Sequence, residues 1–153
     1  MSDINKLKEL RQQTGVSYSL CKKALEESKN DIAAAKKLLS KWAGKELAEK
    51  QQKSTMAGAL FSYVHHNRKV VSVVELLCET DFVSGNSEFH TLGSELAKQV
   101  ASLPTKTSEE LITQVYIRDS SKKVSDLLKE AVLKFGENIK IGRFMRWELG
   151  ETK

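Results

Sequence analysis

Apolar residues recur every three or four positions in three short stretches of the first 42 residues, which is the period of a helix with one buried face. Thr14–Gly15 ends the first stretch, and Ser17 offers an N-cap for the second. Asn30 or Asp31 can cap the third. The pattern predicts a small bundle of three helices.

A polar and charged stretch, residues 44–56, follows these helices and contains almost no core candidates. Such a stretch is typical of a linker or of a solvated helical extension. We therefore expect a domain boundary here, between a three-helix module of residues 1–43 and a second domain of residues 57–153.

Beyond residue 57 the apolar pattern becomes that of a β-hairpin. Residues 59–64 and 70–77 are predicted strands, and residues 66–68 form the turn between them. The second strand is apolar on both alternating sets, which predicts that it is central and that little of it faces water.

Helical periodicity returns at residues 87–102, 108–113 and 124–135, with Gly136 in the C′ position of the last helix. Alternation of apolar and polar residues over 139–149 predicts a closing strand. An antiparallel sheet with helices packed on one face is an α+β fold.

Composition places the chain among ordinary globular proteins, with 153 residues, 40% of them apolar and 29% charged. No apolar run approaches the 18 or so residues of a membrane span, and the N-terminus has no features of a secretory or transit signal. A cytoplasmic location is therefore expected. Cys21 and Cys78 stand alone in the sequence, which disfavours a disulfide or a zinc site.

The net charge of +5 is carried by the N-terminal third of the chain. Residues 1–53 contain 12 lysines and arginines against 7 acidic residues, whereas the remainder is balanced. A basic segment suits either nucleic acid or an acidic protein partner. Lys22–Lys23 lies beside an apolar stripe and is also compatible with an ordinary solvated helix face.

Glu79–Val83 is the stretch that points most directly to a function. It follows the β-branched run of the second predicted strand and precedes the turn formers Gly85–Asn86. We expect a loop that presents Asp81 and Phe82 at the end of the strand, because loops held by a rigid sheet often carry function. The alternative is that Phe82 is a core ring and Asp81 a cap.

Catalytic signatures are missing from the sequence, including a phosphate-binding glycine loop, a zinc-protease helix and a nucleophile elbow. His65 and His66 are adjacent near a strand end, where neighbouring side chains point to opposite faces, so a shared metal ion is not expected. Asp81 with His65 could form a base and its orienting partner, but no nucleophile accompanies them. We expect no enzymatic activity, no cofactor and no metal.

Three groups of segments resemble the elongation factor Ts family, the guanine-nucleotide exchange factors for elongation factor Tu in bacterial-type translation. The sequence Glu-Thr-Asp-Phe-Val at Glu79–Val83 is the most specific of the matching motifs. The resemblance covers nearly the whole chain and implies an N-terminal three-helix module of the ubiquitin-associated type. The segments that carry it are Leu7–Arg11 with Thr14–Gly15, Cys21–Leu25 and Asn30–Ile32; Ser62–Asn67 with Val74–Val83; and Gly136–Ile139 with Arg143–Phe144.

In that family the Asp-Phe tip is associated with insertion into the partner's G domain near its magnesium site. The resemblance assigns this role to Asp81 and Phe82, which Thr80 and Val83 flank.

The resemblance also implies three further contacts with elongation factor Tu. Phe135–Gly136 matches the position that approaches the partner's phosphate-binding loop, and His65 matches one that contacts another partner domain. Lys23 and its helix resemble the N-terminal contact surface.

The chain departs from the family pattern at two places. Tyr18–Leu20 replaces two frequent methionines and an aspartate, and Leu103–Pro104 leads to Tyr116–Asp119 without the family's long helical insertion. Only one core subdomain fits in this length. Short forms are associated with dimerisation in the family, so we predict a homodimer.

The alternative function is that of a nucleic-acid-associated adaptor, which would use the basic N-terminal module. Under the exchange-factor hypothesis, neither a membrane nor a direct nucleic-acid partner is expected.

Overall fold

The chain divides into two compact units in the computed structural model, which describes residues 2–50 and 54–151. The first unit combines the N-terminal helices with Lys129–Gly136. The second contains residues 54–128 and 137–151. Each unit has its own core, and the two are described in turn.

Three helices form most of the first unit: α1 (Ile4–Thr14), α2 (Tyr18–Glu27) and α3 (Ile32–Lys50). Asp3 caps α1 by accepting hydrogen bonds from the backbone N–H groups of Asn5 and Lys6. The three predicted helices are therefore confirmed, and the third continues into the stretch that the sequence marked as a linker or helical extension. Residues 51–53 of that stretch lie outside the described part of the chain.

The core of the first unit consists of small and branched apolar side chains at helical spacing. Leu133 joins this core from helix α7 (Val124–Phe135), whose second half belongs to the first unit. The sequence pattern assigned that helix as a whole to the second domain. The buried residues of the three N-terminal helices and their connections are Leu7, Leu10, Val16, Cys21, Ala24, Leu25, Ala35, Leu39 and Ala43.

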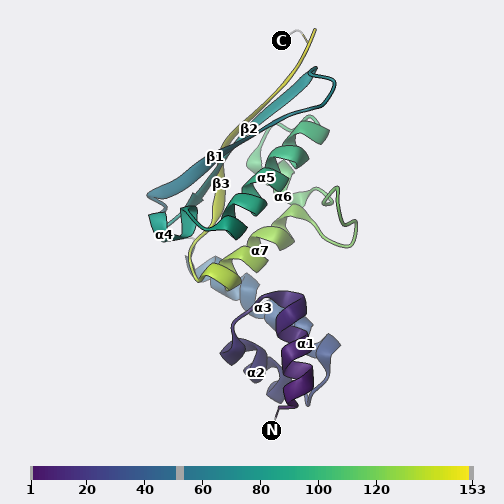
Figure 1. Cartoon of the computed structure of the whole chain (residues 1–153), viewed down its shortest axis with the longest axis vertical. Helices are drawn as coiled ribbons and strands as arrows, with labels where there is room; N and C mark the ends of the chain where they lie inside the picture. The colour runs from purple at the N-terminus through teal and green to yellow at the C-terminus, as the bar shows by residue number, and fades with distance from the viewer. Residues whose placement is uncertain (1, 51–53, 152–153) are drawn as a thin grey trace. The chain divides into compact units, whose positions relative to one another are not determined.

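An antiparallel three-stranded sheet organises the second unit, in the order β1 (Ala57–Val64), β2 (Val70–Cys78), β3 (Lys140–Glu148). β2 lies between its neighbours, as the sequence predicts (Figure 1). The register pairs Val64 with Val71 and Val71 with Trp147, so one row of side chains crosses all three strands.

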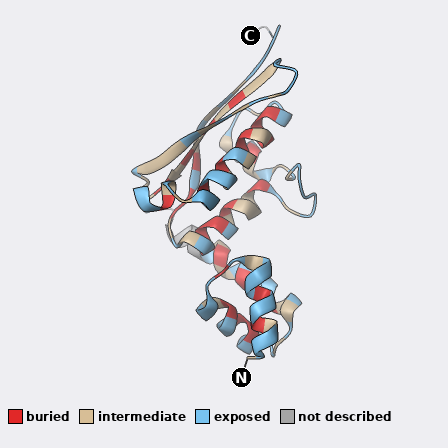
Figure 2. Cartoon of the chain, in the orientation of Figure 1, coloured by how far each residue is buried: buried red, intermediate tan, exposed pale blue. Residues whose placement is uncertain are grey.

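Helix α5 (Ser87–Ser102) packs on one face of the sheet. Its buried positions repeat along the helix (red in Figure 2). Gly93 allows the closest approach, because a Cβ there would overlap the ring of Phe61 on β1. The buried hydroxyl of Ser72 on β2 donates a hydrogen bond to the carbonyl of Ala97. The shorter helix α6 (Ser108–Thr113) contacts β3, so the predicted α+β fold is confirmed.

The opposite face of the sheet has no helical layer among the described residues. On β2, the residues that point toward α5 are buried, whereas the alternate set is only half-buried. The expectation that little of β2 faces water therefore holds for one side only, because a single layer of helices covers the sheet. The half-buried set is Val71, Val73, Glu75 and Leu77.

Within the described residues, no helix combines the length and the apolar character that crossing a membrane requires.

Candidate partner-binding site

The predicted tip is a single helical turn, α4 (Asp81–Ser84), rather than a loop. The turn forms because Thr80 is an extended N-cap whose hydroxyl accepts a hydrogen bond from the N–H of Val83 at 3.4 Å. Gly85 closes it by donating its N–H to the carbonyl of Asp81. The sequence contains this capping signal, but four residues are too few to show a helical period.

Neighbouring residues of α4 face opposite surroundings. Phe82 is 87% exposed, whereas Val83 is 5% exposed and belongs to the core. Asp81 is exposed as well. The alternative in which Phe82 is a core ring is therefore wrong, and the cap of the turn is Thr80 rather than Asp81. A large apolar ring and a carboxylate are presented together to the solvent.

A second segment of the chain anchors the start of this turn. The carboxylate of Glu137 accepts hydrogen bonds from the N–H groups of Glu79 and Thr80, both at 3.1 Å, and from the Thr80 hydroxyl at 2.7 Å. In return, the carboxylate of Glu79 accepts the N–H of Asn138 at 2.6 Å. Sequence reasoning missed this pairing, because nothing local to either segment indicates a partner nearly 60 residues away.

His65 lies at the other end of the hairpin from α4. β2 has nine residues, which corresponds to roughly 30 Å between its ends. The half-buried His65 ring places Nδ1 2.9 Å from the hydroxyl of Tyr63. Its centroid lies 4.2 Å from that of His66, so the two rings do not point to opposite faces as expected. The reason is that the strand ends at Val64, so strand alternation no longer applies.

The remaining predicted contact residues belong to the first unit. Lys23 is exposed on α2, with its ammonium nitrogen 5.2 Å from the centroid of the Trp42 ring. Phe135 is half-buried at the end of α7. Gly136 follows with a φ of 71° and donates its N–H to the carbonyl of Val132. This left-handed backbone conformation is typical of a glycine that ends an α-helix. Of the eight predicted residues, Thr80–Val83 lie together on α4 and its N-cap, His65 lies at the other end of the hairpin, and the other three belong to the first unit.

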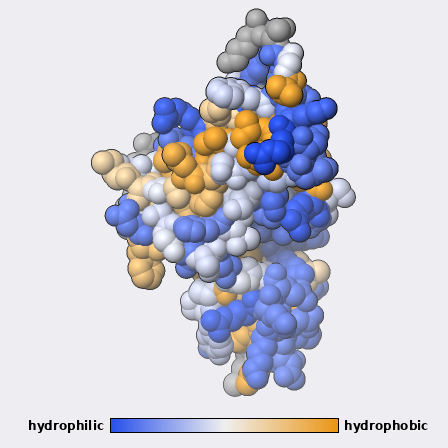
Figure 3. Space-filling view, turned by 45° about the horizontal axis from the view of Figure 1, so that its top comes forward, coloured by the Kyte–Doolittle hydropathy of each residue, from blue (hydrophilic) through white to orange (hydrophobic). Residues whose placement is uncertain are grey.

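The uncovered face of the sheet, which we call the open sheet face, is apolar along all three strands. Leu60, Val64 and Trp147 on this face are 69%, 51% and 59% exposed. Figure 3 shows hydrophobic side chains (orange) gathered over the part of the chain that contains the sheet. A monomer rarely leaves such a face uncovered, so the open sheet face is a candidate interface.

One ion pair interrupts the open sheet face. The carboxylate of Glu75 accepts hydrogen bonds from the backbone N–H of Arg143 at 3.1 Å and from its guanidinium at 3.2 Å. These two bonds lower the pKa of Glu75 below its ordinary value. Gly142 makes room for the carboxylate, because a Cβ there would overlap it. Among the residues described, the two charges near the centre of this face therefore form an ion pair with each other.

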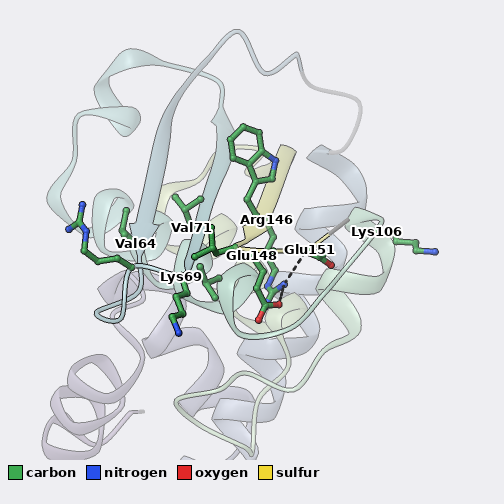
Figure 4. Close-up of a pocket in the computed structure, with 12 residues that line it drawn as sticks. Val64, Lys69, Val71, Lys106, Arg146, Glu148 and Glu151 are labelled. Carbon is green, nitrogen blue, oxygen red and sulfur yellow. Dashed lines mark hydrogen bonds and ion pairs between the residues drawn. The ribbon is translucent and has the colours of Figure 1, made fainter. Parts of the chain in front are cut away.

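A groove of about 970 Å³ continues the open sheet face at the hairpin-turn end. Figure 4 shows Val64 and Val71 on its wall and Arg146 directed toward Glu148 and Glu151. The guanidinium of Arg146 pairs with Glu148 at 3.3 Å and also donates to the carbonyl of Ala101. The groove thus combines apolar side chains of the open sheet face with a cation that is already paired, and Arg68, Lys69 and Lys106 also line it.

The described residues contain no group of three histidine, cysteine or acidic side chains that could hold a metal ion. Burial raises the pKa of the thiols of Cys21 and Cys78 above the ordinary value, so both stay protonated near neutral pH.

Comparison with known proteins gives a consistent result. The family model of elongation factor TS matches residues 79–153, which include α4 and its anchor. The chain is 35% identical over 188 residues to elongation factor Ts of Thermotoga neapolitana, covering 95% of both chains. It is also 35% identical over 189 residues to elongation factor Ts of Leptospira biflexa serovar Patoc, covering 94% of this chain and 96% of the relative.

Both alignments are longer than the 153 residues of this chain, so these relatives contain residues that have no counterpart here. Each alignment nevertheless covers almost the entire length of both proteins. The chain therefore belongs to the elongation factor Ts family of translation elongation factors.

Proposed function

We propose that the chain is a guanine-nucleotide exchange factor that promotes release of GDP from elongation factor Tu. The observation that carries the proposal is the 87% exposure of Phe82. The turn that presents it is held by the buried side chain of Val83 and by the hydrogen bond from the Thr80 hydroxyl to Glu137. A phenyl ring that contributes so little to its own fold is available to bury itself in a partner. Membership of the elongation factor Ts family supports elongation factor Tu as that partner.

In the proposed mechanism, contacts between the factor and elongation factor Tu replace contacts between elongation factor Tu and its nucleotide. A GTPase holds its nucleotide through magnesium and through backbone N–H groups around the phosphates. A thousandfold faster release requires the barrier to fall by about 4 kcal/mol. Burial of a phenyl ring supplies about 2 to 3 kcal/mol, and contacts around Phe82 supply the rest. Asp81, a carboxylate beside that ring, disturbs the magnesium and phosphate side electrostatically.

Such a factor acts by thermodynamic coupling, without covalent chemistry and without a cofactor of its own. Linkage requires that a factor which weakens nucleotide binding is itself displaced by nucleotide. The site of action is cytoplasmic, where translation takes place.

Three further surfaces extend the proposed contact. Phe135–Gly136 approaches the phosphate-binding loop of the partner, and His65 contacts a second partner domain. The roughly 30 Å between the two ends of β2 suits contacts with separate parts of one large partner. Lys23 and the three-helix module of residues 1–43 provide the N-terminal contact.

The second proposed partner is another copy of this chain. Two open sheet faces packed against each other would form a two-layer β-sandwich and cover Leu60, Val64 and Trp147 on both sides. The Glu75–Arg143 pair supports this arrangement, because neither charge would be buried without its counterpart.

The basic N-terminal third supports one alternative, a nucleic-acid-associated adaptor. That function predicts binding to RNA or DNA that weakens steeply with salt and needs no elongation factor Tu. A gel-shift assay across a salt series distinguishes the two, since an exchange factor should show no such binding.

The direct test is stopped-flow release of labelled GDP from elongation factor Tu. The unaltered chain should accelerate release, and Phe82→Ala should lose at least about tenfold of that acceleration while the fold is retained. Leu103→Ala is the matched control, since Leu103 is also an exposed apolar residue of the second unit but lies outside the tip. Equal release by the Phe82→Ala variant and the unaltered chain would exclude the anchoring role of the ring.

A further inference from the structure

The carboxylate of Glu137 is linked to the exposed tip through one hydroxyl group. Thr80 Oγ1 donates to Glu137 Oε2 at 2.7 Å and accepts the N–H of Val83 at 3.4 Å. A continuous path of hydrogen bonds therefore runs from Glu137 through Thr80 into the turn that carries Asp81 and Phe82. Thr80 alone could cap the turn, but it could not fix the direction of the turn relative to the sheet.

The attachment has more than one point. Glu137 also receives the backbone N–H groups of Glu79 and Thr80, and Glu79 receives the N–H of Asn138. Asn138 is 1% exposed, so one end of this pairing lies within the core. Because each segment supplies both a carboxylate and N–H donors, the pairing restrains rotation of the tip as well as its position. Hydrogen bonds to an ionised carboxylate are stronger than those between neutral groups.

Restraint of this kind matters because the tip has little other support. Four residues cannot sustain a helix alone, and the exposed Phe82 ring contributes little packing. If the restraint were lost, only a fraction of the molecules would present the ring and Asp81 in the geometry that the partner needs. The activity would fall to that fraction of its original value.

We propose that Glu137 is a positioning residue of the exchange tip, which holds Thr80 and thereby orients Asp81 and Phe82. This inference rests on the proposed function. It assigns to Glu137 a role that requires no contact with elongation factor Tu, and Glu79 completes the same pairing from the other segment.

The test compares Glu137→Ala with Glu137→Gln in the full chain. Glu137→Ala should lower the GDP release rate at saturating factor about tenfold, and should leave the half-saturating concentration nearly unchanged, because the other docking surfaces remain. Glu137→Gln keeps an oxygen acceptor for the N–H groups and should lose less. Glu109→Ala is the matched control, since it removes an exposed glutamate elsewhere in the second unit and should not alter release.

Hydrogen exchange provides the readout that separates positioning from general destabilisation. In Glu137→Ala, the amides of Thr80 and Val83 should exchange faster while those of β2 and α5 keep their protection. If Glu137→Ala fails to fold, Thr80→Val and Thr80→Ser replace it: the first removes the hydroxyl and should lose release activity, and the second keeps the hydroxyl and should retain it.

Unaltered release by Glu137→Ala, measured where Phe82→Ala is defective, overturns the positioning role and leaves the exchange function standing. If the unaltered chain itself fails to accelerate GDP release from elongation factor Tu, the exchange function is wrong. In that case, amide exchange at Thr80 in Glu137→Ala still tests whether Glu137 anchors the turn. Protection at Thr80 equal to that of the unaltered chain would refute the anchoring.

Discussion

Phe82 and Val83 are consecutive in the sequence and opposite in environment: the ring of Phe82 is 87% exposed, and the side chain of Val83 is 5% exposed. The turn of α4 places one residue against the core and turns the other outward. Val83 therefore contributes to the core, while the neighbouring Phe82 carries the proposed partner contact, so substitutions can separate stability from the proposed binding.

Val83→Ala should lower the free energy of unfolding by about 2 kcal/mol, because two buried methyl groups are lost. Phe82→Ala should change it by less than about 0.5 kcal/mol, since the ring is largely solvated already. Denaturant unfolding of both variants measures the contrast. Comparable destabilisation by the two substitutions would mean that the ring packs on its own chain.

Gly93→Ala should destabilise the protein by about 1 to 3 kcal/mol, because the new Cβ would overlap the ring of Phe61 where α5 crosses β1. Gly44→Ala is the matched control within α3. A Cβ at Gly44 meets no atom within 4 Å, so that substitution should stabilise the helix by about 0.5 to 1 kcal/mol. Thermal unfolding of both variants checks the signs, and a neutral Gly93→Ala would contradict the close approach.

Tyr116 should lower stability at alkaline pH. Burial, together with the hydrogen bond from its hydroxyl to Glu95 at 2.9 Å, raises the pKa of Tyr116 from 10.0 to about 12. The folded state disfavours the tyrosinate, so the protonated Tyr116 contributes to the free energy of unfolding. This stabilising contribution is complete below pH 10.0 and is lost as the pH rises toward about 12. Denaturant unfolding at several pH values in that window should show a shallower decline for Tyr116→Phe. An identical decline would argue against the shift.

Trp147→Lys should convert a dimer into a monomer, because it places an unpaired charge on each of the two packed sheet faces. Light scattering coupled to gel filtration should give about twice 17.2 kDa for the unaltered chain and 17.2 kDa for the variant. Leu103→Lys, which alters an exposed leucine outside the sheet face, should remain dimeric. A monomeric unaltered chain at high concentration would exclude the proposed sandwich.

Much of the fold could be predicted from local patterns. The apolar period defined the long helices, Gly15 and Gly136 marked two helix ends with left-handed backbone conformations, and alternation defined the strands. These features depend on residues close together in the sequence. The extent of α3 beyond residue 43 was harder to predict, because a polar stretch suits both a linker and a solvated helix.

The missed features depend on distant residues. The pairing of Glu79 with Asn138 and of Glu137 with Thr80 joins segments that only the folded sheet brings together. The two apolar sets of β2 suggested coverage on both sides, but among the described residues of the second unit helices pack on one face of the sheet, and the other set of β2 is only half-buried. The sequence predicted that Asp81 and Phe82 are presented to the solvent at the end of β2, and both are exposed, but it did not predict the helical turn that presents them.

The shortness of α4 has one more consequence. Forming a first helical turn is unfavourable in a free chain, so the shape of the Asp81–Phe82 tip is supplied by its surroundings. A synthetic hexapeptide with the sequence of residues 79–84 would be an unstructured mixture of conformers. It could not imitate the intact factor, and a small-molecule mimic would have to provide its own rigid frame.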